Sequence, residues 1–215
     1  MTPELSLPIQ TAWLIPLYGF IGMLVSLPWA CGWFRRDAHR PAAYLNILLT
    51  LLAFAHGSLI LQEVYQSGPV DLAFPWLSVA DLELNISFSL SLTNLVALEL
   101  ITGLSLLSQV YSLGYMDKEW ALARFFALLG FFEGAMSGVV LSDSLFQSYF
   151  LLEMLTLSTY LLVGFWYAQP LVVTAARDAF LTKRVGDVLL LMGVVALCSY
   201  SVSYTHLRAH ETHDD

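Results

Sequence analysis

The sequence predicts an all-α integral membrane protein with six transmembrane helices and one extramembrane hairpin loop. Of its 215 residues, 58% are hydrophobic and 12% are charged, and the mean hydropathy is +0.69. The apolar residues form long runs, whereas a soluble helix carries a dispersed apolar stripe. Several runs reach the roughly 20 residues that a helix needs to cross a hydrocarbon core of about 30 Å. These features are typical of a membrane chain.

Six segments have the length and composition of a membrane-spanning helix. The N-terminal stretch "MTPELSLPIQTAW" carries the acid Glu4 and no basic residue before the first apolar run. A secretory signal peptide begins with a basic region, so we expect the first helix to be retained. The six predicted helices cover residues of about 11–34, 42–64, 91–114, 122–142, 145–168 and 172–198.

The region between the second and third helices is predicted to lie outside the membrane. Gly68, Pro69 and Pro75 disfavour a helix there, and "LELNISFSL" alternates apolar and polar residues with a period of two. That pattern predicts a short β-hairpin. In the turn "LSDSLF" between the fourth and fifth helices, Asp143 is expected to cap the following helix.

Lysine and arginine side chains set the expected orientation. Up to residue 198 they all fall on one side of the predicted bundle, and the positive-inside rule places that side in the interior compartment. The N-terminus is then expected on the outer side. The net charge of −8 argues against a nucleic-acid partner. Cys31 and Cys198 have the spacing of neither a disulfide framework nor a metal site. The basic residues are Arg35, Arg36, Arg40, Lys118, Arg124, Arg177, Lys183 and Arg184.

Ionisable residues inside the spans are the candidate functional residues, because such groups are costly in lipid and usually face a bundle interior. Glu153 lies in the fifth helix, roughly 12 Å below its outer end at about 1.5 Å per residue. Counted from the turn at 168–171, Asp187 of the sixth helix has a similar depth. Lys183 and Arg184 precede Asp187 by four and three residues, so either can reach it. We expect a network with one base between two carboxylates, an arrangement suited to a proton pathway.

Structural explanations stand beside these assignments. Arg184 could neutralise Asp187 as a clamp, while Lys183 extends to the inner surface. Glu133 of the fourth helix lies in a row of small residues, Gly130, Gly134 and Gly138, which favours close helix contact. Packing and proton relay therefore both remain open for Glu133. Glu99 and His56 are weaker candidates of the same kind.

Two consecutive stretches carry a family resemblance. "RFFALLGFFEGAMSGVVLSDSLFQSYFLLEMLTLSTYLLVGFWY" followed by "AARDAFLTKRVGDVLLLMG" resembles the beginning of the antiporter-like subunit 5 of respiratory complex I and its photosynthetic relatives, the NuoL/NdhF family. The resemblance covers about residues 10–198. Within the family, "RRDAHRPAAYLN", "AQPLVV" and "RDAFLTKRVGD" are most similar to the cyanobacterial variants that serve CO2 uptake.

The resemblance implies a proton-translocating subunit of an NDH-1-type complex, a NAD(P)H- or ferredoxin-plastoquinone oxidoreductase of the cyanobacterial thylakoid membrane. It places Glu153 on the family's essential glutamate, which a lysine of the seventh helix modulates, and Arg184 and Asp187 on a pair that couples neighbouring subunits. No cofactor is expected in this chain, because the quinone and redox centres belong to partner subunits. Other membrane subunits are implied as partners, with a zinc-containing, CO2-hydrating peripheral subunit in the CO2-uptake variant.

The resemblance also implies that this chain is an N-terminal fragment, inactive alone, since the seventh-helix lysine would lie beyond Asp215. Residues 199–215 form a polar tail that contains "SYTHLRAHET", a string similar to an adapter-derived peptide, so we expect an artefact. A natural tail or a weak metal site of His206, His210 and His213 are the alternatives. Two other functions stay open for the whole chain: a sodium/proton antiporter subunit, and a six-helix accessory or assembly protein with structural ion pairs.

Overall fold

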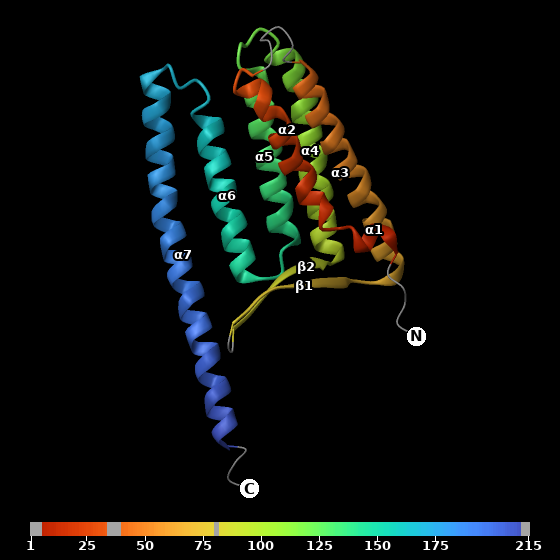
Figure 1. The fold of residues 1–215 in the computed structure, drawn as a ribbon, viewed down its shortest axis with the longest axis vertical. Helices are drawn as coiled ribbons and strands as arrows, with labels where there is room; N and C mark the ends of the chain where they lie inside the picture. Colours follow the sequence, from red (N-terminus) through yellow and green to blue (C-terminus); the bar gives the residue numbers. More distant parts are fainter. Residues whose placement is uncertain (1–5, 34–39, 80–81, 212–215) are drawn as a thin grey trace.

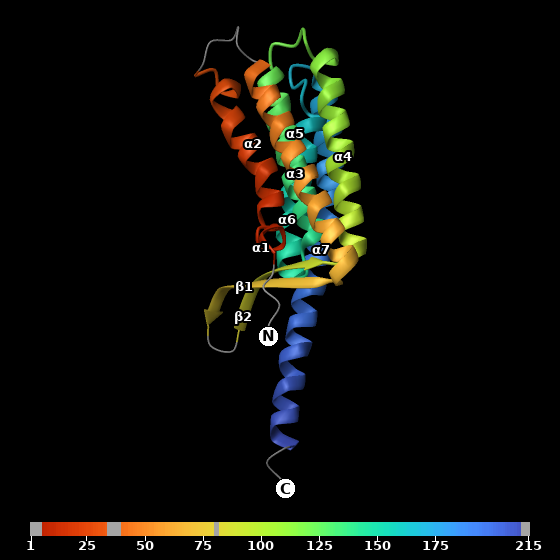
Figure 2. The same cartoon turned by 90° about the vertical axis from the view of Figure 1, so that its right-hand side faces the viewer.

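The computed structural model describes residues 6–33, 40–79 and 82–211, which form an up-and-down helical bundle with a β-hairpin at one end (Figure 1). Seen from the side, the long helices run roughly along one direction and the hairpin lies across their ends (Figure 2). The elements in chain order are α1 Leu7–Gln10, α2 Leu14–Ala30, α3 Arg40–Ser67, β1 Val70–Val79, β2 Leu82–Leu90, α4 Leu92–Tyr115, α5 Leu122–Leu141, α6 Leu145–Val163 and α7 Pro170–Glu211.

Within the described residues, four helices are long and apolar enough to cross a membrane: α3, α4, α5 and α6. These four agree with the sequence prediction. The other two predicted spans do not meet the same measure. Helix α2 is apolar but has only 17 residues, and every 18-residue stretch of α7 between 170 and 197 includes Lys183, Arg184 and Asp187. Because of these three charged residues, α7 differs in composition from the four apolar helices.

Helix α5 occupies the centre of the bundle, because α2, α3, α4 and α6 all pack against it. Its contact with α2 is a backbone contact made by glycines. A Cβ atom built on Gly19 would lie 2.5 Å from the amide nitrogen of Gly134, and one built on Gly134 would lie 2.8 Å from the carbonyl oxygen of Pro16. On another part of α5, a Cβ at Gly138 would meet the side chain of Leu151 on α6 at 3.0 Å. The glycine row thus lets two helices approach α5 closely.

The buried Asn46 of α3 fastens that helix to α2. Its side-chain amide donates to the carbonyl oxygens of Gly22 (3.2 Å) and Ala42 (3.1 Å) and contacts the hydroxyl of Ser26. A polar group buried in a bundle needs such partners to offset its loss of water. The network fixes α2 and α3 side by side at this level.

The predicted hairpin forms as two antiparallel strands, with Val70 opposite Leu90 and an irregularity after Pro75. It is attached to the α5–α6 turn, because the amide of Asp143 donates to the carbonyl of Ser87 at 3.1 Å. The expected capping role of Asp143 is wrong, since the N-cap residue of α6 is Ser144 and no side chain caps that helix. The backbone of Asp143 instead joins the turn to β2.

Helix α7 lies at the edge of the bundle, where it packs against α6 and extends past the hairpin (Figure 1). At the end of the bundle opposite the hairpin, α2, α4 and α6 end and α3, α5 and α7 begin, and four described basic residues lie there: Arg40, Lys118, Arg124 and Arg177. Arg40 forms a salt bridge of 2.5 Å with Asp117 there. Arg35 and Arg36 lie outside the described residues.

Candidate functional site

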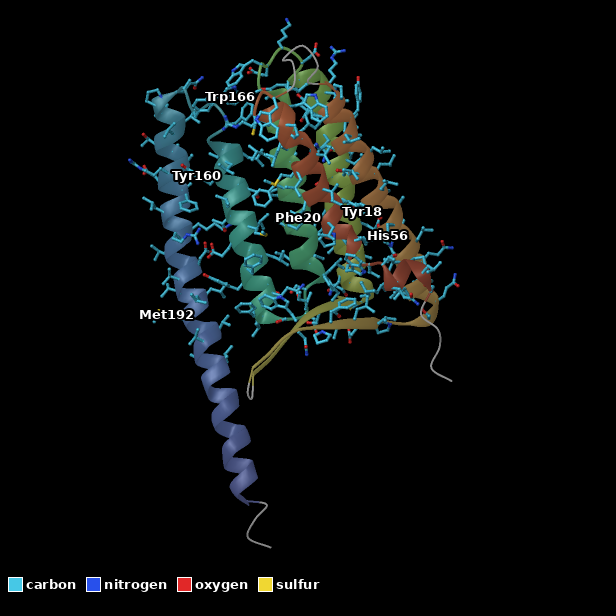
Figure 3. All side chains as sticks on the ribbon, viewed as in Figure 1. Tyr18, Phe20, His56, Tyr160, Trp166 and Met192 are labelled. Carbon is cyan, nitrogen blue, oxygen red and sulfur yellow. The ribbon has the colours of Figure 1, made fainter. Side chains whose placement is uncertain are left out.

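An ion pair joins α6 to α7 at the edge of the bundle. The guanidinium of Arg184 contacts Oε2 of Glu153, and the two side chains are 37% and 21% exposed. Figure 3 labels Tyr160 on α6 and Met192 on α7, the two helices that the pair joins. Lys183, the other predicted partner, is exposed. The structure therefore brings Arg184, and not Lys183, to the central glutamate.

Aromatic rings hold Arg184 toward α6. Its Cζ lies 4.8 Å from the ring centroid of Phe180, one turn earlier on α7. The ring of Phe180 in turn packs against Tyr160 of α6, with centroids 5.0 Å apart. Cation–π contact and ring packing restrict where the guanidinium can point. The orientation of Arg184 is thus set by both helices.

Two carboxylate oxygens at this site have no hydrogen-bond partner among the described residues. They are Oε1 of Glu153 and Oδ2 of Asp187, and both are buried. In the described part of the chain no ion pair joins Asp187 to Lys183 or Arg184, although the sequence spacing allows one. Arg184 reaches across to the neighbouring helix and so leaves Asp187 without a salt bridge. Tyr149, one turn before Glu153, hydrogen-bonds to the carboxylate of Glu153 and also lies within electrostatic reach of Arg184 and Asp187.

Glu133 belongs to a second polar cluster, between α3, α4 and α5. The side-chain amide of Gln109 donates to Oγ1 of Thr50 at 2.8 Å, and Thr50 donates to Oε2 of Glu133 at 2.6 Å. All three residues are at most 1% exposed. Oε1 of Glu133 has no partner in the described structure. Glu133 therefore has polar contacts of its own, separate from the glycine contacts that α5 makes with α2.

The two weaker candidates have separate partners near the hairpin half of the bundle. Glu99 of α4 accepts a hydrogen bond from Ser58 of α3 at 3.0 Å. His56 Nε2 lies 3.2 Å from the hydroxyl of Thr11 and 3.1 Å from the carbonyl of Pro8. Figure 3 shows His56 beside Tyr18, and their ring centroids are 6.1 Å apart. His56 thus ties α3 to α1 and the start of α2.

Sequence reasoning missed Thr50, Gln109 and Tyr149. A signal for Thr50 was present, because it lies ten residues after the start of α3 and Glu133 lies eleven residues after the start of α5. These two helices start at the same end of the bundle, so the residues have matching depth.

Among the described residues no group of three or more His, Cys, Asp or Glu side chains is placed to hold a metal ion. The side chains of the tail histidines His206, His210 and His213 lie outside the described part. The backbone of α7 continues as a helix to Glu211. The artefact interpretation of the tail stays a prediction.

Comparisons with known proteins converge on one family. A family model described as NADH-ubiquinone oxidoreductase (complex I), chain 5 N-terminus, matches residues 76–126. A second, described as NADH:quinone oxidoreductase/Mrp antiporter, TM, matches residues 142–211. Together they cover more than half of the chain.

Named relatives agree. The chain is 75% identical over 203 residues to NAD(P)H-quinone oxidoreductase subunit 5, organellar chromatophore 2, of Paulinella chromatophora, covering 94% of this chain and 33% of that protein. It is 31% identical to the chloroplastic subunit 5 of Chara vulgaris, covering 91% of this chain and 30% of that protein. The chain therefore spans about a third of the length of these curated relatives.

A solved structure shows the same fold. The Mrp complex from Dietzia sp. DQ12-45-1b matches with a TM-score of 0.63 and 22% identity, over 85% of this chain and 19% of the matched chain. At this identity the likeness concerns the fold alone.

Proposed function

The chain belongs to the family of complex I chain 5 subunits, and on that premise we propose that it forms the N-terminal part of a proton-translocating membrane subunit of a NAD(P)H-quinone oxidoreductase. The observation that carries this proposal is the Glu153–Arg184 ion pair between α6 and α7. Ionisable pairs within a membrane bundle are costly and mark ion or proton pathways. The proposal concerns the whole subunit, of which this chain is a part.

Glu153 is the proposed proton-binding group, and Arg184 is its movable counter-ion. A nearby cation stabilises a carboxylate, and loss of that cation in a poorly hydrated site favours the protonated form. An arginine keeps its charge, so Arg184 affects the proton on Glu153 by its position and not by its own titration. Beside the hydroxyl of Tyr149, the carboxylate of Glu153 still has the buried Oε1 as a contact for a proton donor or a further cation.

Asp187 is the proposed alternative partner of Arg184. It lies three residues after Arg184, and its buried Oδ2 has no partner among the described side chains. Movement of the guanidinium from Glu153 to Asp187 would leave Glu153 without its cation and favour protonation of Glu153. The position of Arg184 between α6 and α7 would thereby control proton uptake. We propose that the exposed side chain of Lys183 extends toward the inner surface. We also propose that Glu133 relays protons together with Thr50 and Gln109.

The proposal extends to the membrane and the partners. We propose six spans, with α2 and α7 crossing alongside the four apolar helices and the N-terminus on the outer, lumenal side of a thylakoid membrane. The partners are other membrane subunits, which carry the quinone and redox centres, and ferredoxin or NAD(P)H supplies electrons. The stretches "RRDAHRPAAYLN" and "RDAFLTKRVGD" support the CO2-uptake variant, with a CO2-hydrating peripheral subunit.

The test uses Glu153→Gln in the full-length subunit within its purified complex. Glutamine keeps the size of the side chain and cannot bind and release a proton at neutral pH. We expect normal assembly on native gels and loss of proton uptake into reconstituted vesicles. The matched control is Glu119→Gln, in the turn between α4 and α5, which should pump normally. Normal pumping by an assembled Glu153→Gln complex would refute the role of Glu153.

A second candidate function is the related subunit of a sodium/proton antiporter. It is favoured by the second family model, whose description includes the Mrp antiporter, and by the fold shared with the Mrp complex of Dietzia. The two functions differ in driving force. Quinone-dependent pumping without added sodium supports the oxidoreductase, and sodium-dependent proton exchange without quinone supports the antiporter.

A further inference from the structure

A cavity of about 220 Å³ opens at the basic end of the bundle, where α2 ends, α5 begins and α6 connects to α7. Its lining includes Trp29, Trp120, Arg124 and Tyr167, together with small residues next to them. The volume is below the roughly 300–1,000 Å³ of pockets for drug-sized ligands, and so suits a small headgroup. Neither the ion pair of α6 and α7 nor the Glu133 cluster lines this cavity.

The end of α2 shapes one wall. Gly32 has φ +78°, a left-handed conformation that glycine adopts without a Cβ penalty. The amide of Trp33 donates to the carbonyl of Pro28 at 2.9 Å, which closes the helix as in a Schellman motif. Helix α2 therefore ends beside the cavity, and residues 29–32 form one of its walls.

Arg124 is the charged group of the cavity. Its Cζ lies 4.9 Å from the ring centroid of Tyr167 and 5.4 Å from that of Phe165, so the two rings fix the guanidinium plane. No carboxylate of the described residues forms a salt bridge with it. A guanidinium that is stacked but lacks an acid partner keeps its donors for an external anion, and its planar fork suits phosphate or sulfonate oxygens.

The aromatic side chains locate the cavity at a membrane interface. Trp120 is 61% exposed and Tyr167 is 54% exposed, and their rings meet edge to face with centroids 6.4 Å apart. Exposed tryptophan and tyrosine at the ends of membrane helices lie at the headgroup level. The apolar helices α5 and α6 extend from this end into the proposed hydrocarbon region.

We propose that this cavity binds the headgroup of an anionic membrane lipid, with Arg124 contacting the phosphate or sulfonate and the rings of Trp120 and Tyr167 enclosing it. A lipid is favoured over a soluble anion, because exposed aromatic rings gain by contact with acyl and glycerol groups. The site is independent of proton coupling, so it stands or fails separately from the function proposed above.

The experiment measures lipid retention by the purified complex that contains the full-length subunit. The complex is exchanged into nanodiscs of phosphatidylglycerol and phosphatidylcholine, and bound lipids are counted by native mass spectrometry. Wild type should retain phosphatidylglycerol in preference to phosphatidylcholine. Arg124→Gln should lower this retention about fivefold or more, the effect of one basic residue at an anionic surface, and Arg124→Lys should keep most of it.

Lys118→Gln is the matched control, because Lys118 is an exposed base in the connection just before α5 and does not line the cavity. Equal retention by assembled Arg124→Gln and Lys118→Gln complexes would overturn the site. Inorganic phosphate that binds as tightly as the lipid would overturn the membrane source. If Arg124→Gln does not assemble, Trp120→Ala, which keeps the guanidinium, should show the same loss, and unchanged retention would contradict the proposal.

Discussion

Replacing Gly19 by alanine should force α2 and α5 apart. The new Cβ would lie 2.5 Å from the amide nitrogen of Gly134 and 2.6 Å from the carbonyl oxygen of Gly130. Ordinary contact begins at 3.4 Å, so the two backbones must separate by about 0.9 Å. A gap of that size loses a quarter to a half of the dispersion energy of each facing atom pair.

The net cost follows from two opposing effects. Overpacking of this kind costs about 1–3 kcal/mol, and alanine gains about 1 kcal/mol over glycine in a helix. We therefore expect Gly19→Ala to lower the free energy of unfolding by up to about 2 kcal/mol. Gly134→Ala, whose Cβ would lie 2.8 Å from Pro16, should cost less. Gly103→Ala, which meets only the Phe54 ring at 3.4 Å, should be neutral or stabilising.

Thermal unfolding of the full-length subunit in nanodiscs measures this order. Each variant is compared with wild type under the same lipid conditions, and helix content is followed by circular dichroism. An unfolding temperature that is lowest for Gly19→Ala, higher for Gly134→Ala and highest for Gly103→Ala would support a direct backbone contact. A Gly19→Ala protein as stable as Gly103→Ala would show that α2 and α5 are not packed as described.

Two further predictions concern the polar clusters. Thr50→Val should lower the free energy of unfolding by about 1–2 kcal/mol, because Gln109 and Glu133 lose their shared hydroxyl; Thr50→Ser should restore it, and equal thermal stability of the two variants would contradict the network. Arg184→Gln should impair proton pumping in the assembled complex because it removes the cation beside Glu153, whereas Lys183→Gln should pump normally because Lys183 is exposed. An equal effect of both substitutions on pumping rates would count against the pairing.

Much of the helical layout could be predicted, because length and apolarity act locally. The observed α4, Leu92–Tyr115, differs from its predicted range by one residue at each end. The β-hairpin was predictable for the same reason, since alternation of side chains is a local pattern. The C-terminal end of α7 was not predictable in the same way. The predicted helix ended with the apolar residues at 198, whereas the observed helix continues through polar residues to Glu211.

The candidate site was predicted in part. Counting residues from the turn between α6 and α7 predicts that Glu153 and Asp187 have a similar depth, and Arg184, three residues before Asp187, does contact Glu153. Sequence spacing alone did not tell which base makes the contact, because Lys183 and Arg184 are adjacent and the helix rotation decides between them. The partner of Glu133, Thr50, lies 83 residues away in sequence, and Gln109, which donates to Thr50, lies 59 residues from Thr50; only tertiary packing brings them together.

The position of α7 on the outside of α6 bears on how the chain is made. The ribosome delivers α6 before α7, so Glu153 enters the bilayer first, and a carboxylic acid can do so as a neutral group. Arg184 follows, and an arginine has no neutral form available to it. Because α7 packs against α6, the acceptor is already in place when the permanent charge arrives. In the six-span arrangement proposed above, the order of synthesis would therefore spare the insertion machinery an unpaired arginine in lipid.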